Sequence, residues 1–180
     1  MKNITLWHSN IFQADFIYKA NIKNSYNIPK IKNISLNICS KSIIENPKNI
    51  IYILLAIKFI TNQNPTVCTL KKSIPTFKLR QGMLIGSKVN LSNHSRNFNH
   101  FFYMVAIYVL PNLTKPKLKF QKNESTSSIA INVSDLSIFP QINCWYDKFP
   151  KNVKSTINIS VASTHHKYIK LLLTSLQVYF

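Results

Sequence analysis

The chain has 180 residues, of which 23 are Lys or Arg and 5 are Asp or Glu, so its formal net charge is +18. A hydrophobic content of 46% and an aromatic content of 12% can fill a core and exclude a fully disordered chain. A folded body with this charge repels itself unless an anionic partner neutralises it, and nucleic acid is the commonest such partner, ahead of an anionic membrane surface.

The N-terminal region reads as a helix followed by a strand. Apolar residues at helical spacing predict a helix over residues 9–24, with Ser9 or Asn10 as its cap. Within 29–39 the residues from Ile34 onward alternate between apolar and small polar side chains, which predicts a half-buried strand with a neutral polar face. A face that docks on a partner and an ordinary solvated face are both open readings.

A second helix and two short strands follow, joined by a basic loop. Residues 47–61 predict a core helix with Pro47 in its first turn. The β-prone runs 66–70 and 86–91 are separated by the stretch 71–86, which has no helical or strand periodicity and holds both glycines of the chain. Because this stretch is too long for a tight hairpin, we expect a protruding loop whose cations suit a polyanion. For its Phe77, packing back onto the loop is favoured over stacking on a base.

The C-terminal half completes the expected fold. We predict a helix over 99–110, an exposed basic segment over 113–128, a strand over 128–133, an extended piece over 138–142, a strand over 155–162 and a closing helix over 164–176. Mixed helices and strands with several adjacent strands indicate an α+β fold of two layers. One face of an antiparallel sheet would carry the helices and the other would be free, within a single domain over 1–180 that comprises an N-terminal helix and turn (1–27) and the protruding basic loop (71–86).

No motif points to catalysis, a metal or a cofactor. The three cysteines, Cys39, Cys68 and Cys144, are far apart and odd in number, so we expect buried free thiols, not a zinc site or a disulfide framework. His165 and His166 have no acidic or thiol partner at ligand spacing, and a helix-start pair is the favoured reading. We therefore expect neither an enzyme nor a bound cofactor.

Two apolar runs, residues 50–57 and 101–110, are too short to span a bilayer and are expected to be core helices. No secretory signal peptide is recognisable at the N-terminus. A basic protein that binds a membrane surface without inserting is the alternative function class.

Several stretches, in order, resemble the bacterial-type large-subunit ribosomal protein five family, which binds 5S ribosomal RNA. The most specific is Lys72–Leu91; weaker ones are 28–37, 61–65, 138–142 and 157–161. Within the loop, Pro75 and Thr76 stand where the family has alanine and glycine, and the family's glycine- and arginine-containing segment is replaced by 124–128. The abundance of Asn, Ile and Lys is typical of an AT-rich genome, and with this divergence it favours a mitochondrial location, in the matrix, over a plastid.

The resemblance implies a structural protein of the central protuberance of the large subunit. Its partners would be 5S rRNA (or its replacement), large-subunit rRNA, P-site tRNA and neighbouring ribosomal proteins, including a small-subunit head protein across an intersubunit bridge. The expected rRNA contacts are Lys30, Lys32, Asn37, Gln63, Thr69, Lys88 and Asn90. For Asn37, Gln63 and Asn90, local capping or turn bonding is the alternative. The expected tRNA-contacting residues are Lys71, Lys72, Ser73, Phe77, Lys78, Arg80 and Gly82, within a contact loop of residues 73–82.

Overall fold

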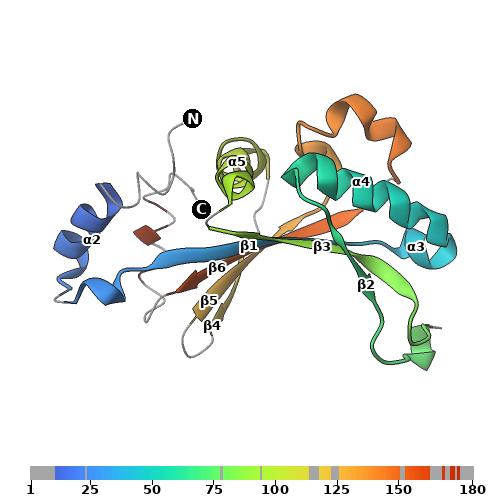
Figure 1. The fold of residues 1–180 in the computed structure, drawn as a ribbon, viewed down its shortest axis with the longest axis horizontal. Coiled ribbons are helices and arrows are strands. Elements are labelled where there is room, and N and C mark those ends of the chain that lie inside the picture. Colours follow the sequence, from blue (N-terminus) through green and yellow to red (C-terminus); the bar gives the residue numbers. More distant parts are fainter. Residues whose placement is uncertain are drawn as a thin grey trace. The chain divides into compact units, whose positions relative to one another are not determined.

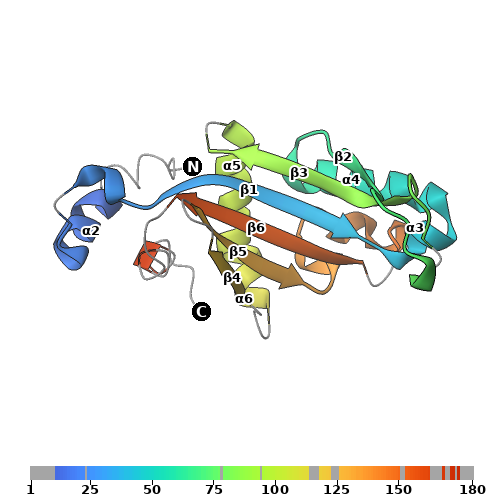
Figure 2. The same cartoon turned by 90° about the horizontal axis from the view of Figure 1, so that it is seen from below.

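The structure, a computed structural model, describes residues 11–22, 24–77, 79–93, 95–113, 118–122, 126–150, 153–162, 168, 171–172 and 174. Its strands form a six-stranded antiparallel sheet in the order β2-β3-β1-β6-β5-β4 (Figures 1 and 2). This arrangement confirms the α+β class predicted from the sequence. The strands are β1 (Lys30–Cys39), β2 (Thr66–Thr69), β3 (Leu84–Ser92), β4 (Leu118–Lys122), β5 (Thr126–Val133) and β6 (Lys154–Ala162). The helices are α2 (Gln13–Ala20), α3 (Lys41–Glu45), α4 (Ile50–Thr61), α5 (Arg96–Met104) and α6 (Leu110–Asn112), with a π-helical turn η5 (Val105–Val109) between the last two.

The chain divides into two compact units. Unit 1 comprises Met1–Ile34, Leu91–Ile131 and Asn158–Phe180, and unit 2 comprises Ser35–Asn90 and Asn132–Ile157. The expectation of a single domain over 1–180 stays a prediction.

Unit 2 packs α4 on one face of its strands (Figure 1). In β1 the alternation that predicted a strand is borne out, because Leu36 and Ile38 are buried while Asn37 between them is half-buried. The buried side of α4 presents Ile53, Ala56, Ile57 and Ile60. The helix ends at Asn62, whose left-handed backbone (φ 53°) is a conformation that asparagine tolerates better than most residues. The predicted helix over 47–61 is thus confirmed, beginning with a 3-10 turn at Pro47–Asn49.

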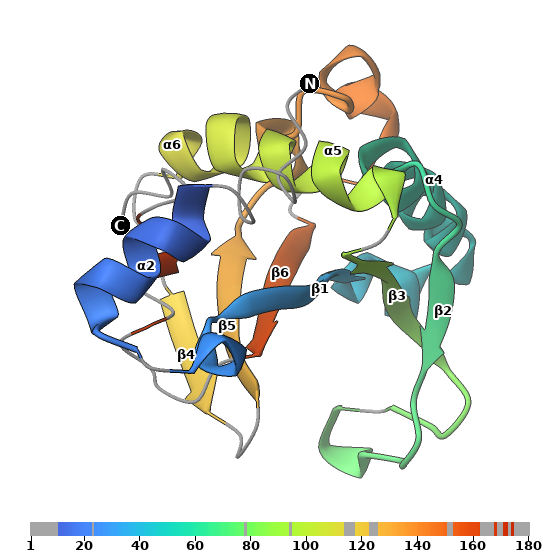
Figure 3. The ribbon, with the colours of Figure 1, turned by 60° about the vertical axis from the view of Figure 1, so that its left-hand side comes forward.

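Unit 1 has an aromatic core. Phe16 of α2 is buried and meets the ring of Tyr168 edge to face, with ring centroids 5.2 Å apart. Helix α5 buries Phe98, Phe101 and Phe102, and it continues through η5 into α6 as one helical segment (Figure 3). The hydroxyl of Ser95 caps α5 by accepting a hydrogen bond from the Phe98 N–H at 3.2 Å. The helix predicted over 9–24 is present as α2 and is shorter than predicted. The helix predicted over 99–110 is present as α5, η5 and α6 and is longer than predicted.

One element of the C-terminal half was missed and one prediction there is wrong. Residues 113–128 were expected to be an exposed basic segment, and no strand was predicted before 128, but β4 lies there and pairs antiparallel with β5, which supplies its hydrogen bonds. Residues 138–142 were expected to be extended, but Ile138 ends the 3-10 turn η6 (Leu136–Ile138) and 139–142 form the turn that leads into η7 (Asn143–Lys148). The buried side chains here, Leu136, Phe139 and Ile142, are three residues apart, which is the period of a 3-10 turn and not of a strand.

The cysteines are not buried as expected, since Cys39 and Cys144 are exposed and Cys68 is half-exposed. Cys39 ends β1 on the face without helices, and Cys144 lies on η7. Their positions in the fold therefore outweigh the preference of cysteine for the interior.

Helix α3, capped by Ser40, was not predicted. The strand over 155–162 is confirmed as β6. The proposed cap at Ser9 or Asn10 and most of the closing helix over 164–176 lie outside the described residues. No described helix is both long and apolar enough to cross a bilayer.

Candidate nucleic-acid interface

The face of unit 2 opposite α4 carries no described helix (Figure 1). Alternate residues of each strand point to it, because side chains in a strand alternate between the two faces. We call this surface the open face; it consists of Ser35, Asn37 and Cys39 on β1, Thr66 and Cys68 on β2, Gly86, Lys88 and Asn90 on β3, Asn132 on β5, and Lys154 and Thr156 on β6. Only two of these residues are charged, and both are lysines.

Asn37 carries a hydrogen-bond acceptor that has no donor within the described chain. Its Oδ1 atom is buried and has no hydrogen-bond partner among the described residues. An unsatisfied buried acceptor costs about 1–3 kcal/mol. A ligand hydroxyl or amino group placed against the strand recovers this free energy only if the Asn37 amide turns outward to meet it.

The structure brings three of the seven expected rRNA contacts together. Asn37, Lys88 and Asn90 share the open face, on the neighbouring strands β1 and β3. Thr69 is exposed at the end of β2, where the basic loop begins. Gln63 lies off the strands, in the connection from α4 to β2, and its N–H donates to the Thr61 hydroxyl at 3.4 Å.

Lys30 and Lys32 are exposed on the first part of β1, which belongs to unit 1. Gly86 and Thr156 lie on the open face but were not among the residues predicted for it. The signal that could have identified them is alternation along the strand. Gly86 precedes the buried Ser87, and Thr156 lies between the buried Ser155 and Ile157.

The basic loop is a hydrogen-bonded extension of the β2–β3 pair. The Leu70 N–H donates to the Met83 carbonyl and the Gly82 N–H to the Leu70 carbonyl, each at 3.0 Å. Further out, Ile74 and Leu79 exchange backbone hydrogen bonds of 2.9 and 3.2 Å, which close a 3-10 turn at Pro75–Phe77. The loop that we expected from its lack of periodicity is therefore a structured arm.

Two polar details fix the return half of the arm. The Gln81 N–H donates to the Ser73 hydroxyl at 3.0 Å. Gly82 has φ +85°, a conformation open to glycine and strained for most side chains, although nothing within 4 Å would obstruct an added Cβ.

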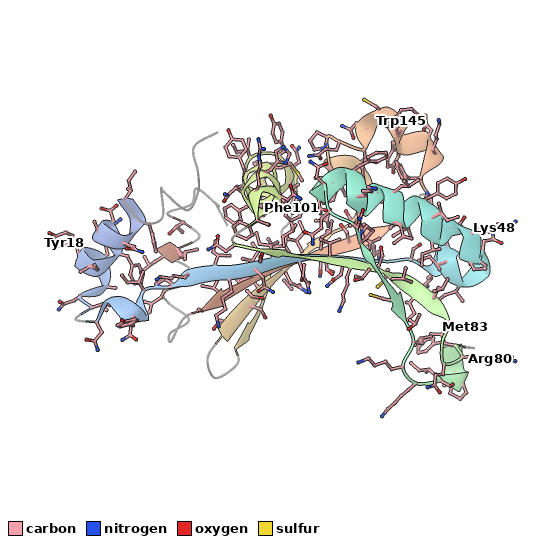
Figure 4. The ribbon with its side chains drawn as sticks, viewed as in Figure 1. Tyr18, Lys48, Arg80, Met83, Phe101 and Trp145 are labelled. Carbon is pink, nitrogen blue, oxygen red and sulfur yellow. The ribbon has the colours of Figure 1, made fainter. Side chains whose placement is uncertain are left out.

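The arm presents its cations and one aromatic ring to solvent. Lys71, Lys72 and Arg80 are exposed, and among the described residues the one ion pair is elsewhere, between Asp15 and Lys19 (Figure 4). Phe77 is 71% exposed, so the prediction that it packs back onto the loop is wrong. The 3-10 turn that carries it is only three residues long and has no core beneath it. Lys78 lies outside the described residues.

The thiol of Cys39 is the one site group with a resolved shift in acidity. Partial desolvation of the thiol by the adjacent strands raises the pKa of Cys39, and the neighbouring Cys68 raises it further. The strand register explains why the two free thiols are neighbours. Cys68 lies opposite Gly86 on β3, and Cys39 lies against the same glycine from β1. Among the described residues, no three His, Cys, Asp or Glu side chains gather as a metal site would require.

Comparison with known proteins gives a consistent result. A family model described as "Ribosomal protein L5" matches residues 24–80. The chain is 32% identical over 179 residues to "Large ribosomal subunit protein uL5m" of Reclinomonas americana, covering 99% of this chain and 97% of that one. It is 34% identical over 146 residues to the uL5 protein of Desulfosudis oleivorans (81% and 78%), and 30% identical over 176 residues to that of Buchnera aphidicola (97% and 96%).

Proposed function

The chain belongs to the ribosomal protein L5 family, and from this premise we propose that the open face of unit 2 binds 5S rRNA or the RNA that replaces it. The family makes it a structural protein of the large ribosomal subunit that serves translation, and not an enzyme. The uL5m name of the Reclinomonas relative supports a mitochondrial ribosome as its location.

The observation that carries the RNA proposal is the unpaired Oδ1 of Asn37 in the middle of a neutral sheet face. Double-stranded RNA displays 2′-hydroxyls across a wide, shallow minor groove, and these are donors that DNA lacks. Small side chains such as Ser35, Asn90 and Thr156 allow such a groove to approach the sheet closely. Lys88 and Lys154 then contact the flanking phosphates.

The arm performs a second role, contact with P-site tRNA. Its exposed cations, Lys71, Lys72 and Arg80, neutralise phosphates, and the hydrogen-bonded ladder holds them in place before binding. The exposed ring of Phe77 is available to stack on a base or to pack on a ribose. Because the arm and the open face are separate surfaces of unit 2, the two RNAs are bound by different residues.

Two further parts of the proposal rest on family membership. The protein sits in the central protuberance, next to large-subunit rRNA, and it takes part in a bridge to a protein of the small-subunit head. Chemical cross-linking of intact ribosomes tests the bridge.

Binding of the purified chain to a 5S-type RNA, measured over a series of salt concentrations, tests the main proposal. We expect affinity to fall with salt, because each phosphate neutralised contributes a slope of roughly 0.7–0.9, and to drop when the RNA carries 2′-deoxy substitutions. A flat salt response, or equal affinity for unrelated hairpins, would contradict the proposal.

A further inference from the structure

Helix α4 is apolar on nearly every side. Its buried side chains pack within unit 2, but four more apolar residues face outward. Ile51, Tyr52, Leu55 and Phe59 are 57%, 43%, 41% and 45% exposed. With 3.6 residues per turn, Ile51, Leu55 and Phe59 follow one another at spacings of four and Tyr52 lies beside them. We call these four residues the outer α4 stripe.

A stripe of this kind is unusual on a solvated helix. A surface helix normally places charged and polar residues opposite its buried face, and a helix that is hydrophobic all round is usually buried. Single exposed apolar residues need no explanation, but four on one helix face form a patch of the sort that marks an interaction site. We therefore expect a partner to cover the outer α4 stripe.

RNA is a poor occupant, because phosphate binding needs a cluster of cations, and the described residues 47–61 carry two, Lys48 and Lys58, at opposite ends of an apolar face. A second copy of this chain is also disfavoured. Both copies carry a net charge of +18, and a twofold contact on this face would repeat Lys58 and Lys48 on both sides.

The charges at the ends of the stripe identify the favoured partner. Lys48 stands just before α4 and points away from the body (Figure 4), and Lys58 lies near its end. The two lysines are ten positions apart, which corresponds to a rise of about 15 Å along a helix. The stretch 47–63 contains no Asp or Glu, so a partner with carboxylates at both ends of an apolar segment meets complementary charge along α4 itself.

We propose that the outer α4 stripe docks another protein of the large ribosomal subunit, through a segment whose apolar anchors are flanked by acidic residues. An amphipathic helix laid along α4 has this chemistry. The proposal uses the chain's place in the large subunit and does not depend on which RNA the open face binds.

Hydroxyl-radical footprinting tests the proposal on native material. Labelling of Tyr52, Leu55 and Phe59 is compared between the purified free chain, intact large subunits and subunits treated with ribonuclease. We expect labelling to disappear in the subunits and to stay absent after ribonuclease. Equal labelling in the free chain and in subunits overturns the proposal, and so does protection that disappears with the RNA.

A zero-length carbodiimide cross-linker then identifies what covers the stripe, since it joins lysines directly to carboxylates. We expect Lys48 and Lys58 to cross-link, within purified large subunits, to acidic residues that flank one apolar segment of a single protein. Cross-links to a second copy of this chain overturn the proposal. Binding of the free chain to anionic phosphatidylglycerol vesicles with protection of the stripe, coupled with no protection in subunits, favours a membrane and overturns it as well.

A matched pair of variants adds a functional readout. Leu55→Glu puts a charge in the middle of the stripe at an exposed position, so folding is spared, and its incorporation into large subunits should fall at least about tenfold, the effect of losing roughly 1.4 kcal/mol of interface energy. Leu55→Met keeps the apolar surface and should incorporate normally. Normal incorporation of the Leu55→Glu chain overturns the proposal.

Discussion

The Sγ atom of Cys39 lies 3.1 Å from the point where a Cβ on Gly86 would stand. The cysteine side chain therefore lies across the glycine, and it fills the space that a side chain on β3 would otherwise occupy. The Ile38 carbonyl oxygen and the Cys39 Cα also crowd that point. Gly86 is thus required for close approach of two strands, and its absent side chain keeps the open face flat next to Asn37.

Replacing Gly86 by Asn should destabilise the chain. Backbone atoms of β1 cannot move aside without disturbing the pairing, so we expect a decrease of roughly 3 kcal/mol in the free energy of unfolding, the upper end of overpacking penalties. Gly82→Asn is the matched control, because it meets no obstruction and asparagine tolerates a positive φ. Denaturant unfolding measures both, and equal stability of the two variants would show that Gly86 has room.

Binding of 5S-type RNA should protect Cys39 from alkylation. Cys39 lies on the open face beside Asn37, whereas Cys144 is exposed on η7 and serves as an internal reference. The raised pKa of the Cys39 thiol leaves it protonated at neutral pH, so the reaction is run at alkaline pH, where more thiolate is present. Mass spectrometry of labelled peptides reads the result. Unchanged labelling of Cys39 in the complex would place the RNA elsewhere.

Replacing Asn37 by Ala should weaken RNA binding without weakening the fold. The Oδ1 atom has no partner in the free chain, so its removal costs little stability, but it deprives an RNA donor of its acceptor, at about 1–3 kcal/mol. Ser87→Ala is the control. Its Oγ is also buried without a partner, but it lies on the helix-covered side of β3, so its removal should leave RNA affinity unchanged. Filter binding and thermal unfolding together distinguish the two, and a decrease in the fold stability of Asn37→Ala would contradict this expectation.

Replacing Phe77 by Ala should weaken tRNA binding to the ribosome and spare the chain's stability. The ring is largely exposed, so the free energy of unfolding should change by no more than about 0.5 kcal/mol. Loss of stacking between this ring and a base costs roughly 1–3 kcal/mol of binding free energy, which P-site occupancy measurements can detect. Phe77→Trp should retain binding. If Phe77→Ala binds tRNA normally, the ring has no role at this interface.

Changing the loop cations Lys71, Lys72, Lys78 and Arg80 to Ala should weaken tRNA placement and leave large-subunit assembly largely intact. The salt dependence of tRNA binding should become shallower, by roughly 0.7 in slope for each phosphate of single-stranded RNA that is no longer neutralised. Sucrose-gradient profiles report assembly alongside. Particles that fail to assemble would assign the arm to the rRNA-docking surface instead.

The sequence predicted the elements that have one dominant period. The alternation of Ile34, Leu36 and Ile38 specified β1, and the apolar spacing of 47–61 specified α4, because burial of one face repeats with the geometry of the element. The charge and the missing periodicity of 71–86 likewise predicted an arm for a polyanion. Residues 138–142 were predicted as an extended piece, since the buried residues of this turn repeat every three positions over too short a run to be distinguished from a strand.

Tertiary structure decided what depends on neighbours that are distant in the chain. β4 exists because β5 supplies its hydrogen bonds, Phe77 is exposed because no described element packs under the arm's tip, and Cys39 is exposed because β1 directs it to a face that no described helix covers. Residue types and local spacing carry no information about these neighbours. The sequence by itself therefore determined the charge, the family resemblance and the main elements, and the tertiary structure determined which side chains remain available to a partner.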